Sequence, residues 1–145
     1  MRYFILVLAL AGVIVSSLAL HVHYSTGTEP CDINAKWDCG IVNHSSYSMF
    51  MHVPVAALGI AGYLVLGLLA AVRRRGLLLV ASLVALGFAL YLSHVEKDIL
   101  QVWCLYCVIS QGIIAILTLC SIGWFVAFER SKLHSPKPAH NPPED

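Results

Sequence analysis

The sequence predicts an all-α membrane protein, built as a four-transmembrane-helix bundle whose outer loop carries a short interfacial helix. Three observations lead to this fold class: the composition, four long uncharged stretches, and the grouping of the basic residues. Hydrophobic residues make up 59% of the 145 positions, charged residues only 12%, and the mean hydropathy is +0.78. A soluble domain of this size could not bury so much apolar surface. The net charge of +1 also excludes a strongly basic surface for nucleic acid.

The four stretches are each long enough to cross a membrane, because a helix needs about 20 apolar residues to do so. A single segment in lipid must satisfy its own backbone hydrogen bonds, so we expect each stretch to be a helix. The expected spans are residues 3–21, 53–72, 77–95 and 104–128, all within one membrane domain of residues 1–130. Residues 131–145 contain four prolines and predict a disordered cytoplasmic tail.

The first span has an alternative interpretation as a cleaved signal peptide, because Ser17-Leu18-Ala19 resembles a cleavage site. Its uncharged run of about 18 residues is longer than the 7–15 residues usual in a signal peptide. This length favours a retained helix.

The basic residues predict the orientation of the bundle. One side of a four-span arrangement collects most of them: Arg2, Arg73–Arg75, Arg130, Lys132 and Lys137, whereas the other side carries Lys36 and Lys97. The positive-inside rule then places both termini in the cytoplasm and residues 21–52 in an outer loop on the periplasmic or extracellular side. The connector at 73–76 is so short that the second and third spans should be antiparallel neighbours.

The outer loop contains an apolar segment that we expect to be helical. Ser45 and Ser46 are candidate N-caps for a short helix through Tyr47–Met51. Such a helix would lie on the membrane surface as a partial lid.

Four of the five cysteines fall on the outer side: Cys31, Cys39, Cys104 and Cys107. Cys120 lies about 20 Å further along the last helix than Cys107 does. At that depth we expect a packed thiol without redox chemistry, since free cysteine behaves as a small hydrophobic residue.

The Cys104-Leu105-Tyr106-Cys107 motif opens the last span and predicts redox chemistry. A helix N-terminus favours the thiolate, which is the attacking species. A purely structural disulfide across one helical turn would add little stability. A zinc site is a weaker alternative, because Cys31-x7-Cys39 is unlike a zinc knuckle. A haem site bound by the outer histidines is an equally weak alternative, and a c-type haem would need histidine where Val108 stands.

The loop pair, Cys31 and Cys39, allows two interpretations. It could be a permanent disulfide that pins the loop. Beside a CxxC motif at the membrane edge, it is better explained as the outer half of a thiol–disulfide relay. Four cysteines allow three pairings. A relay would use the 31–39 and 104–107 pairs and a transient 39–104 cross-link.

These features together resemble the vitamin K epoxide reductase family. The resemblance rests on Cys31-x7-Cys39 in the first outer loop, Ser45, the Pro54…Gly59…Gly62-Tyr63 pattern of the second span, and the CxxC that opens the last span. It covers nearly the whole chain, to about residue 128. The segment His52-Val53-Pro54-Val55 is more similar to the bacterial branch than to the animal enzymes.

The resemblance implies a four-helix bundle around a quinone (ubiquinone, menaquinone or vitamin K) and no metal. It implies that Cys31 exchanges with a partner, that Cys39 cross-links to Cys104, and that Cys107 delivers electrons to the quinone. Bacterial members oxidise thioredoxin-like proteins that put disulfides into exported proteins, and some carry that domain fused at the C-terminus. Because this chain ends after its proline-rich tail, we expect a separate thioredoxin-like partner and a place in a bacterial inner membrane.

The chain departs from the animal enzymes at two positions. Gln111 stands where they carry a tyrosine one turn after the CxxC motif, and Val55 is nearest to their asparagine. Reducing a quinone needs a thiolate and a hydrogen-bond donor to the ring oxygens, and Gln111 is a suitable donor about one turn from Cys107. A helix–helix hydrogen bond is its alternative use. The candidate quinone-binding residues are Gln111, Ser45, Phe50 and Tyr63.

The expected function is that of a membrane thiol–quinone oxidoreductase. It would support disulfide formation outside the cytoplasm, or reduce a quinone or vitamin K epoxide. The alternative from another class is a structural four-span protein of the claudin or tetraspanin kind, with a disulfide-pinned outer loop. A quinone-linked oxidase of the DsbB type is closer in chemistry, but its CxxC lies in the first outer loop, which is the reverse of the order here.

Overall fold

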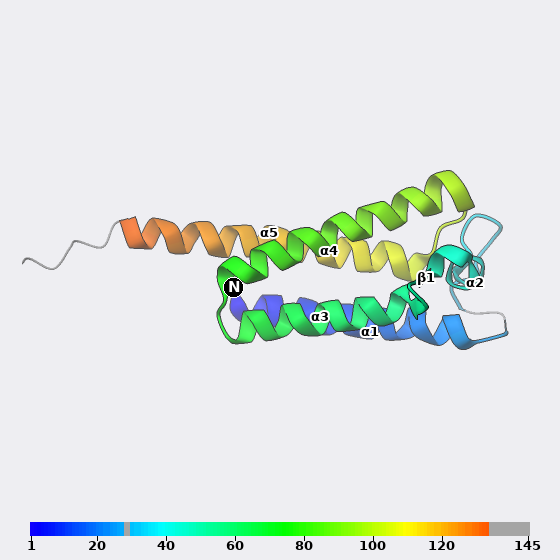
Figure 1. The fold of residues 1–145 in the computed structure, drawn as a ribbon, viewed down its shortest axis with the longest axis horizontal. Helices are drawn as coiled ribbons and strands as arrows, with labels where there is room; N and C mark the ends of the chain where they lie inside the picture. The colour runs from blue at the N-terminus through cyan, green and yellow to red at the C-terminus, as the bar shows by residue number, and fades with distance from the viewer. Residues whose placement is uncertain (28–29, 134–145) are drawn as a thin grey trace, which may run out of the picture.

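Long helices lie side by side in an elongated bundle, and the loop after the first helix forms a cap at one end (Figure 1). The computed structural model describes residues 1–27 and 30–133. The long helices are α1 (Arg2–Tyr24), α3 (Val55–Ala71), α4 (Arg75–Val95) and α5 (Leu105–Leu133). A π-helical turn, η2 (Glu96–Leu100), continues α4. The chain is mostly helical, as the sequence predicts.

Within the described residues, three helices are long and apolar enough to cross a membrane: Arg2–Tyr24, Arg75–Leu100 and Leu105–Leu133. The remaining apolar helix, α3, has 17 residues and is therefore about 26 Å long, slightly less than the roughly 30 Å of hydrocarbon core. The protein is thus an integral membrane protein with at least these three candidate spans. The fourth span stays a prediction.

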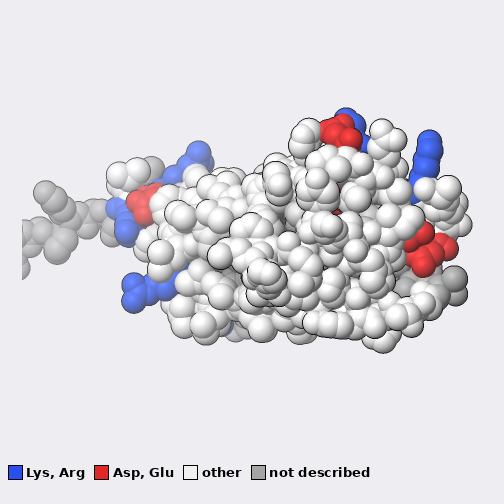
Figure 2. Space-filling model, turned by 45° about the vertical axis from the view of Figure 1, so that its right-hand side comes forward, with Lys and Arg blue, Asp and Glu red and all other residues white. Residues whose placement is uncertain are grey.

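The outward faces of the helices suit a lipid environment. Large apolar side chains are exposed along their length, including Leu10, Leu64, Leu68, Val84 and Leu119. A soluble protein does not expose a continuous apolar surface of this extent. The surface view is correspondingly almost free of charge along the middle of the molecule (Figure 2).

Basic side chains gather at the end of the bundle from which α5 emerges (Figure 2). There the Arg75 guanidinium lies 3.8 Å from the centroid of the Phe128 ring and 5.0 Å from that of Trp124. These cation–π contacts join the start of α4 to the end of α5. Arg73, with φ of 60°, turns the chain sharply between α3 and α4, so that the two helices run antiparallel as predicted.

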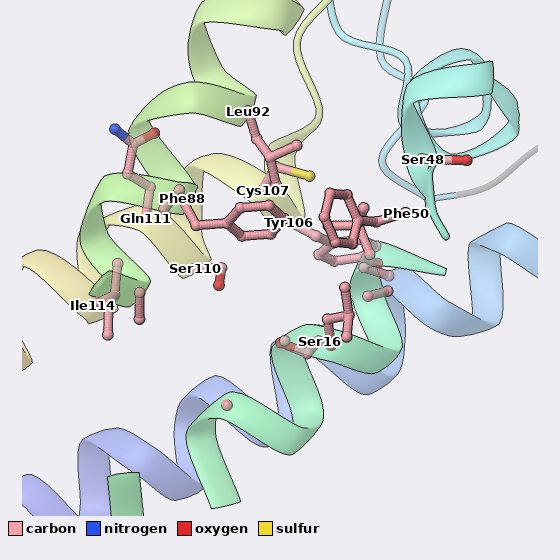
Figure 3. Close-up of a pocket in the computed structure, with 18 of the residues that line it drawn as sticks. Ser16, Ser48, Phe50, Phe88, Leu92, Tyr106, Cys107, Ser110, Gln111 and Ile114 are labelled. Atoms are coloured by element: carbon pink, nitrogen blue, oxygen red, sulfur yellow. The ribbon is translucent and has the colours of Figure 1, made fainter. Parts of the chain in front are cut away.

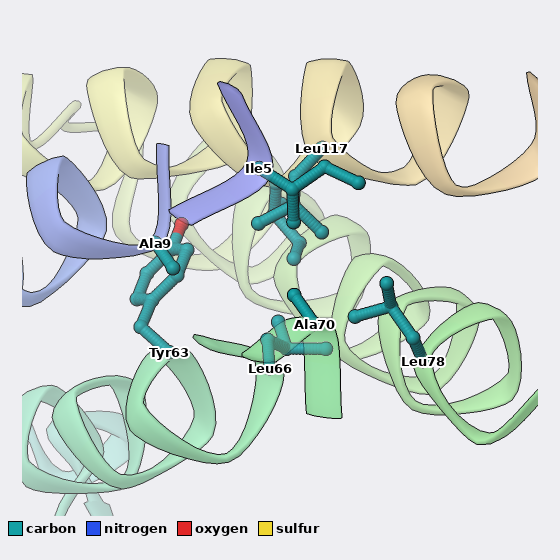
Figure 4. Packing of buried hydrophobic residues seen from close by; sticks show 8 residues of the cluster. Ile5, Ala9, Tyr63, Leu66, Ala70, Leu78 and Leu117 are labelled. Atoms are coloured by element: carbon teal, nitrogen blue, oxygen red, sulfur yellow. The ribbon is translucent and has the colours of Figure 1, made fainter. Parts of the chain in front are cut away.

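The core of the bundle is built from side chains of all four long helices (Figure 4). Ile5 and Ala9 come from α1, Leu66 from α3, Leu78 from α4 and Leu117 from α5. The first span therefore belongs to the packed fold. It runs as one helix through Ser17–Ala19, the segment that resembles a cleavage site.

Small residues let α1 and α3 approach closely. A Cβ added at Gly12 would lie 2.4 Å from ring atoms of Tyr63, and one at Gly59 would lie 2.8 Å from Oγ of Ser16. Such small-residue contacts are typical of helices that pack within membranes, where close van der Waals packing replaces the hydrophobic effect.

The cap differs from the predicted surface helix. Its helical part is α2 (Cys39–His44), followed by a single 3₁₀ turn, η1 (Ser46–Ser48). Strands β1 (Met49–Phe50) and β2 (Val53–Pro54) then form an antiparallel hairpin. Its turn residues, Met51 and His52, have φ values of 50° and 69°, as a two-residue hairpin turn requires. The expected helix through Tyr47–Met51 is therefore wrong beyond Ser48.

The last helix ends slightly later than the sequence predicts. Helix α5 continues to Leu133, so residues 131–133 are helical rather than part of a disordered tail. Residues 134–145, the rest of the predicted tail, lie outside the described part of the chain.

We expect Gly12→Val to destabilise the protein by about 1–3 kcal/mol, because the new side chain must displace the Tyr63 ring. Thermal unfolding in detergent would measure the effect. Gly87→Val is the matched control, because an added Cβ at that helical glycine meets nothing within 4 Å. Equal melting temperatures for the two variants would contradict the close α1–α3 packing.

Candidate active site

The cap brings the four outer cysteines into one place. Cys31, Cys39 and Cys104 are at most 1% exposed and form a buried cluster with Val22 and Val42. Cys107 packs against this cluster. Residues that are more than 60 positions apart in the sequence therefore share one buried site.

A short backbone pairing holds the two cysteine-bearing segments together. Trp103 N–H donates to Lys36 O at 2.8 Å, and Asp38 N–H donates to Trp103 O at 3.1 Å. These bonds make a parallel bridge between Trp37 and Trp103, whose rings lie 6.5 Å apart. Asp38 also starts α2, because its Oδ1 accepts the Ile41 N–H at 2.9 Å. The loop pair is thereby fixed directly beside the CxxC motif.

Cys31 and Cys39 form a disulfide, with Cα atoms 5.8 Å apart. The Asp32 carboxylate supports it by accepting the N–H groups of Cys39 and Gly40 at 3.0 and 3.3 Å. Cys31, Asp32 and Cys39 are also the group of potential metal ligands found among the described residues. With their sulfur atoms bonded to each other, the two cysteines are not free to ligate zinc.

Cys104 and Cys107 are free thiols at the start of α5. A hydrogen bond from the Cys107 side chain lowers the pKa of Cys104, and the Cys107 N–H and the Asn43 amide act in the same direction. Burial and the negative charge of Glu96 oppose this shift without cancelling it. The arrangement therefore favours the thiolate at Cys104, in the way the helix-start position predicts.

Asn43 connects the two pairs. Its side-chain Nδ2 donates to Cys39 O at 2.9 Å and lies 3.6 Å from the Cys104 sulfur. Its backbone carbonyl lies 2.5 Å from His23 Nδ1, which ties the cap to the end of α1. The sequence analysis did not identify Asn43, although it lies one helical turn after Cys39, on the same face of α2.

Glu96 is a second residue that the sequence analysis missed. Its side chain is buried, with 4% of the residue exposed. Its Oε2 accepts the Cys104 N–H at 3.3 Å, so the carboxylate lies beside the CxxC motif at the start of α5. In the sequence, Glu96 looks like a partner of the neighbouring Lys97. A carboxylate eight positions before the CxxC, at the edge of an apolar span, is the signal that could have identified it.

A cavity of about 670 Å³ lies between the long helices, directly below the cap. Figure 3 shows its walls, with Ser16 from α1, Phe50 from β1, Phe88 from α4 and Cys107 from α5. The lining is mostly apolar, and the volume is in the range of ordinary small-molecule sites. Cys107 is thus the cysteine that faces the cavity.

All four residues expected to bind a quinone line this cavity: Ser45, Phe50, Tyr63 and Gln111. Several of their polar atoms already have partners. The Tyr63 hydroxyl donates to Ser110 O at 2.7 Å, and Ser45 Oγ donates to Val42 O at 2.7 Å. Gln111 Oε1 accepts a hydrogen bond from the Ser93 hydroxyl, which is the helix–helix contact considered as its alternative use. Phe50 meets Phe88 edge to face, with ring centroids 6.0 Å apart.

Cys120 lies apart from this site. It is half-buried and packs against the bundle core formed around Leu117 and Ile114. This placement agrees with the expected packed thiol.

We expect Cys107→Ala to raise the pKa of Cys104, because the variant removes the main hydrogen bond that stabilises the thiolate. The midpoint pH of Cys104 alkylation, followed by mass spectrometry of the reduced protein, would measure it. Asn43→Ala should move the midpoint in the same direction by less, and Cys120→Ala should not move it. An unchanged or lower midpoint in Cys107→Ala would contradict the described hydrogen bonding.

Comparison with known proteins agrees with this geometry. The family model of the vitamin K epoxide reductase family matches residues 3–122, which include all four outer cysteines and most of the bundle. No curated protein matches the chain. With a CxxC motif opening α5, a second cysteine pair against it and a family match over most of its length, the chain belongs to the vitamin K epoxide reductase family.

Proposed function

We propose that this protein is a membrane thiol–quinone oxidoreductase that passes electrons from a thioredoxin-like partner through Cys31/Cys39 and Cys104/Cys107 to a quinone. Family membership supports thiol–quinone oxidoreduction in general. One observation supports the whole electron route. Cys31, Cys39 and Cys104 share a buried cluster, and Cys107 packs against this cluster and also faces an apolar cavity. Electrons entering at the cap therefore have a continuous path to a ligand within the bundle.

The first step is exchange with the partner. A thiolate of the partner attacks Cys31, which forms a mixed disulfide and releases the Cys39 thiolate. The second partner thiol resolves this mixed disulfide, and Cys31 and Cys39 are left reduced. Because Cys31 is only 1% exposed, the cap segment that carries it must move to admit the partner.

The second step moves the electrons inward. The Cys39 thiolate attacks Cys104 of an oxidised 104–107 pair and releases the Cys107 thiolate. Cys31 then attacks Cys39, so that the outer disulfide forms again and Cys104 is freed. The structure has an outer disulfide and inner thiols, which is the distribution that this step produces. The Asn43 amide, in contact with both pairs, orients the reacting segments.

The third step reduces the quinone. The inner dithiol loses two electrons and two protons, becomes a disulfide, and converts the quinone into a quinol. Cys107 attacks because it faces the cavity, and Cys104 resolves. The ring would lie against Phe50, close to Ser45 and Tyr63, with the Gln111 amide as a donor to a ring oxygen.

The sidedness of the protein follows from its charges. The basic end of the bundle would lie in the cytoplasm and the cysteine cap outside, in a bacterial inner membrane (Figure 2). On that side, exported proteins acquire disulfides. We therefore favour oxidation of a separate thioredoxin-like partner over reduction of a quinone or epoxide for its own sake.

Quinone reduction by the purified protein in detergent, with a small dithiol as electron donor, tests this proposal. We expect wild type to turn over and Cys107→Ala and Cys104→Ala to fall to background, since each removes one half of the inner pair. Cys120→Ala is the matched control and should keep wild-type activity, because this thiol packs in the core. Failure of wild type with both benzoquinones and naphthoquinones would instead favour a structural four-span protein.

The outer pair is tested separately with a thioredoxin-like protein as donor. Cys31→Ala and Cys39→Ala should then lose turnover, while a small dithiol that reaches the inner pair directly restores it. Equal activity with the protein donor in wild type and both variants would show that the outer pair is only structural.

A further inference from the structure

A buried carboxylate lies beside the two inner thiols without any cation to neutralise it. Glu96 is 4% exposed, and neither ion pair among the described residues includes it. Its Oε2 accepts the Cys104 N–H at 3.3 Å, and its side chain lines the same cavity as Cys107. Burying a carboxylate without an ion-pair partner costs free energy, and such a residue within a membrane protein is by default a candidate functional group.

We propose that Glu96 is a catalytic acid–base residue, which accepts the thiol proton of Cys107 and passes it to an oxygen of the quinone. This inference rests on the proposed function and adds a proton carrier to it. Glu96 accepts the backbone N–H of the CxxC motif and lines the same cavity as Cys107, so one carboxylate lies within reach of both the donor and the acceptor of the proton.

The local fold is arranged to hold Glu96 in this position. It begins the π-helical turn at the end of α4, and such turns are frequent at functional sites. The next three residues, 97–99, are exposed, whereas Glu96 is buried and bonded to the Cys104 N–H. Gln101, with φ of 55°, then reverses the chain and returns Cys104 to the Glu96 carboxylate.

Among the described residues, Glu96 is the only carboxylate that lines the cavity; the other titratable lining groups are Cys107 and the phenols of Tyr47, Tyr63 and Tyr106. On the same turn, His94 and Asp98 pair with each other at 2.5 Å on the exposed side, and Lys97 is exposed. From α3, Tyr63 is bonded to Ser110, and from α1, His23 is bonded to Asn43. Glu96 is thus placed at the CxxC motif, bonded to the Cys104 N–H and on the same cavity wall as Cys107.

The reaction moves two electrons from the inner thiols to the quinone, and two protons reach the ring oxygens. Glu96 takes the Cys107 proton, and the Cys107 sulfur adds to the quinone ring. The Cys104 thiolate attacks the Cys107 sulfur, so that the S–S bond forms, the bond from sulfur to the ring breaks, and its electron pair stays on the ring. Glu96 returns its proton to one ring oxygen. Water supplies the second proton, which replaces the one that Cys104 lost when it ionised.

Glu96→Gln tests the proton transfer while keeping the structure, because glutamine retains an acceptor oxygen for the Cys104 N–H. We expect single-turnover quinone reduction by the pre-reduced variant to be about 100-fold slower at pH 7, a typical loss for removal of a general acid–base group. Its rate should rise about tenfold per pH unit, since hydroxide must now remove the thiol proton, whereas wild type should be nearly flat near neutrality. Glu96→Asp should recover part of the rate.

The matched control is Asp98→Asn, which removes an exposed carboxylate from the same turn and should keep the wild-type rate and pH profile. A second measurement, alkylation of Cys107 by a membrane-permeant reagent, separates chemistry from folding. In Glu96→Gln we expect Cys107 alkylation at close to the wild-type rate, because alkylation over minutes samples the equilibrium thiolate population and needs no carboxylate to carry the proton in each turnover. Quinone reduction and alkylation should thus change differently.

Three outcomes would overturn the inference, and they differ from one another. If Glu96→Gln reduces quinone like wild type with the same pH profile, Glu96 carries no proton while the proposed function stands. If the variant loses both quinone reduction and Cys107 alkylation and melts earlier, Glu96 only positions the CxxC segment. If wild type itself reduces no quinone, the proposed function fails, and the inference fails with it.

Discussion

The backbone pairing of Trp37 with Trp103 is the constraint on which the rest of the site depends. Its two hydrogen bonds, 2.8 and 3.1 Å long, fasten an outer loop to the segment that precedes α5. Without them, the Cys31–Cys39 disulfide would belong to a loop with no fixed relation to the CxxC motif. With them, Cys31, Cys39 and Cys104 are buried in one cluster, and Cys107 packs against it. An electron relay needs sulfur atoms that meet repeatedly in the same geometry, and this pairing supplies that geometry.

Buried polar side chains beside the CxxC motif make its two cysteines chemically different. Hydrogen bonds from Cys107 and from the Asn43 amide lower the pKa of Cys104, whereas Cys107 lines the cavity together with the Glu96 carboxylate. The two thiols therefore differ although they are one helical turn apart. Cys104 is suited to exchange with the outer pair, and Cys107, on the cavity wall, to chemistry within the bundle. The apolar lining below them would accept a ring and exclude water.

The sequence predicted those features that depend on composition, spacing and charge. The apolar stretches gave the long helices, and the CxxC at the start of α5, with the Cys31–Cys39 pair, indicated the family that the match over residues 3–122 confirms. The sequence did not predict features that depend on how distant segments pack against each other. The roles of Asn43 and Glu96 arise only after the cap has docked and the π-helical turn has formed, and neither event has a local signature. The hairpin replaced an expected helix because Met51 and His52 adopt positive φ values, which their residue types do not favour.

We propose that the two cysteine pairs form one relay that ends at a quinone. The most direct test counts the quinols formed when fully reduced protein reacts with excess quinone in the absence of any other reductant. Each dithiol supplies two electrons, so a working relay predicts about two quinols per chain, with all four outer cysteines resistant to alkylation afterwards. About one quinol per chain, with Cys31 and Cys39 still open to alkylation, would show that the outer pair does not pass electrons inward and would contradict the account.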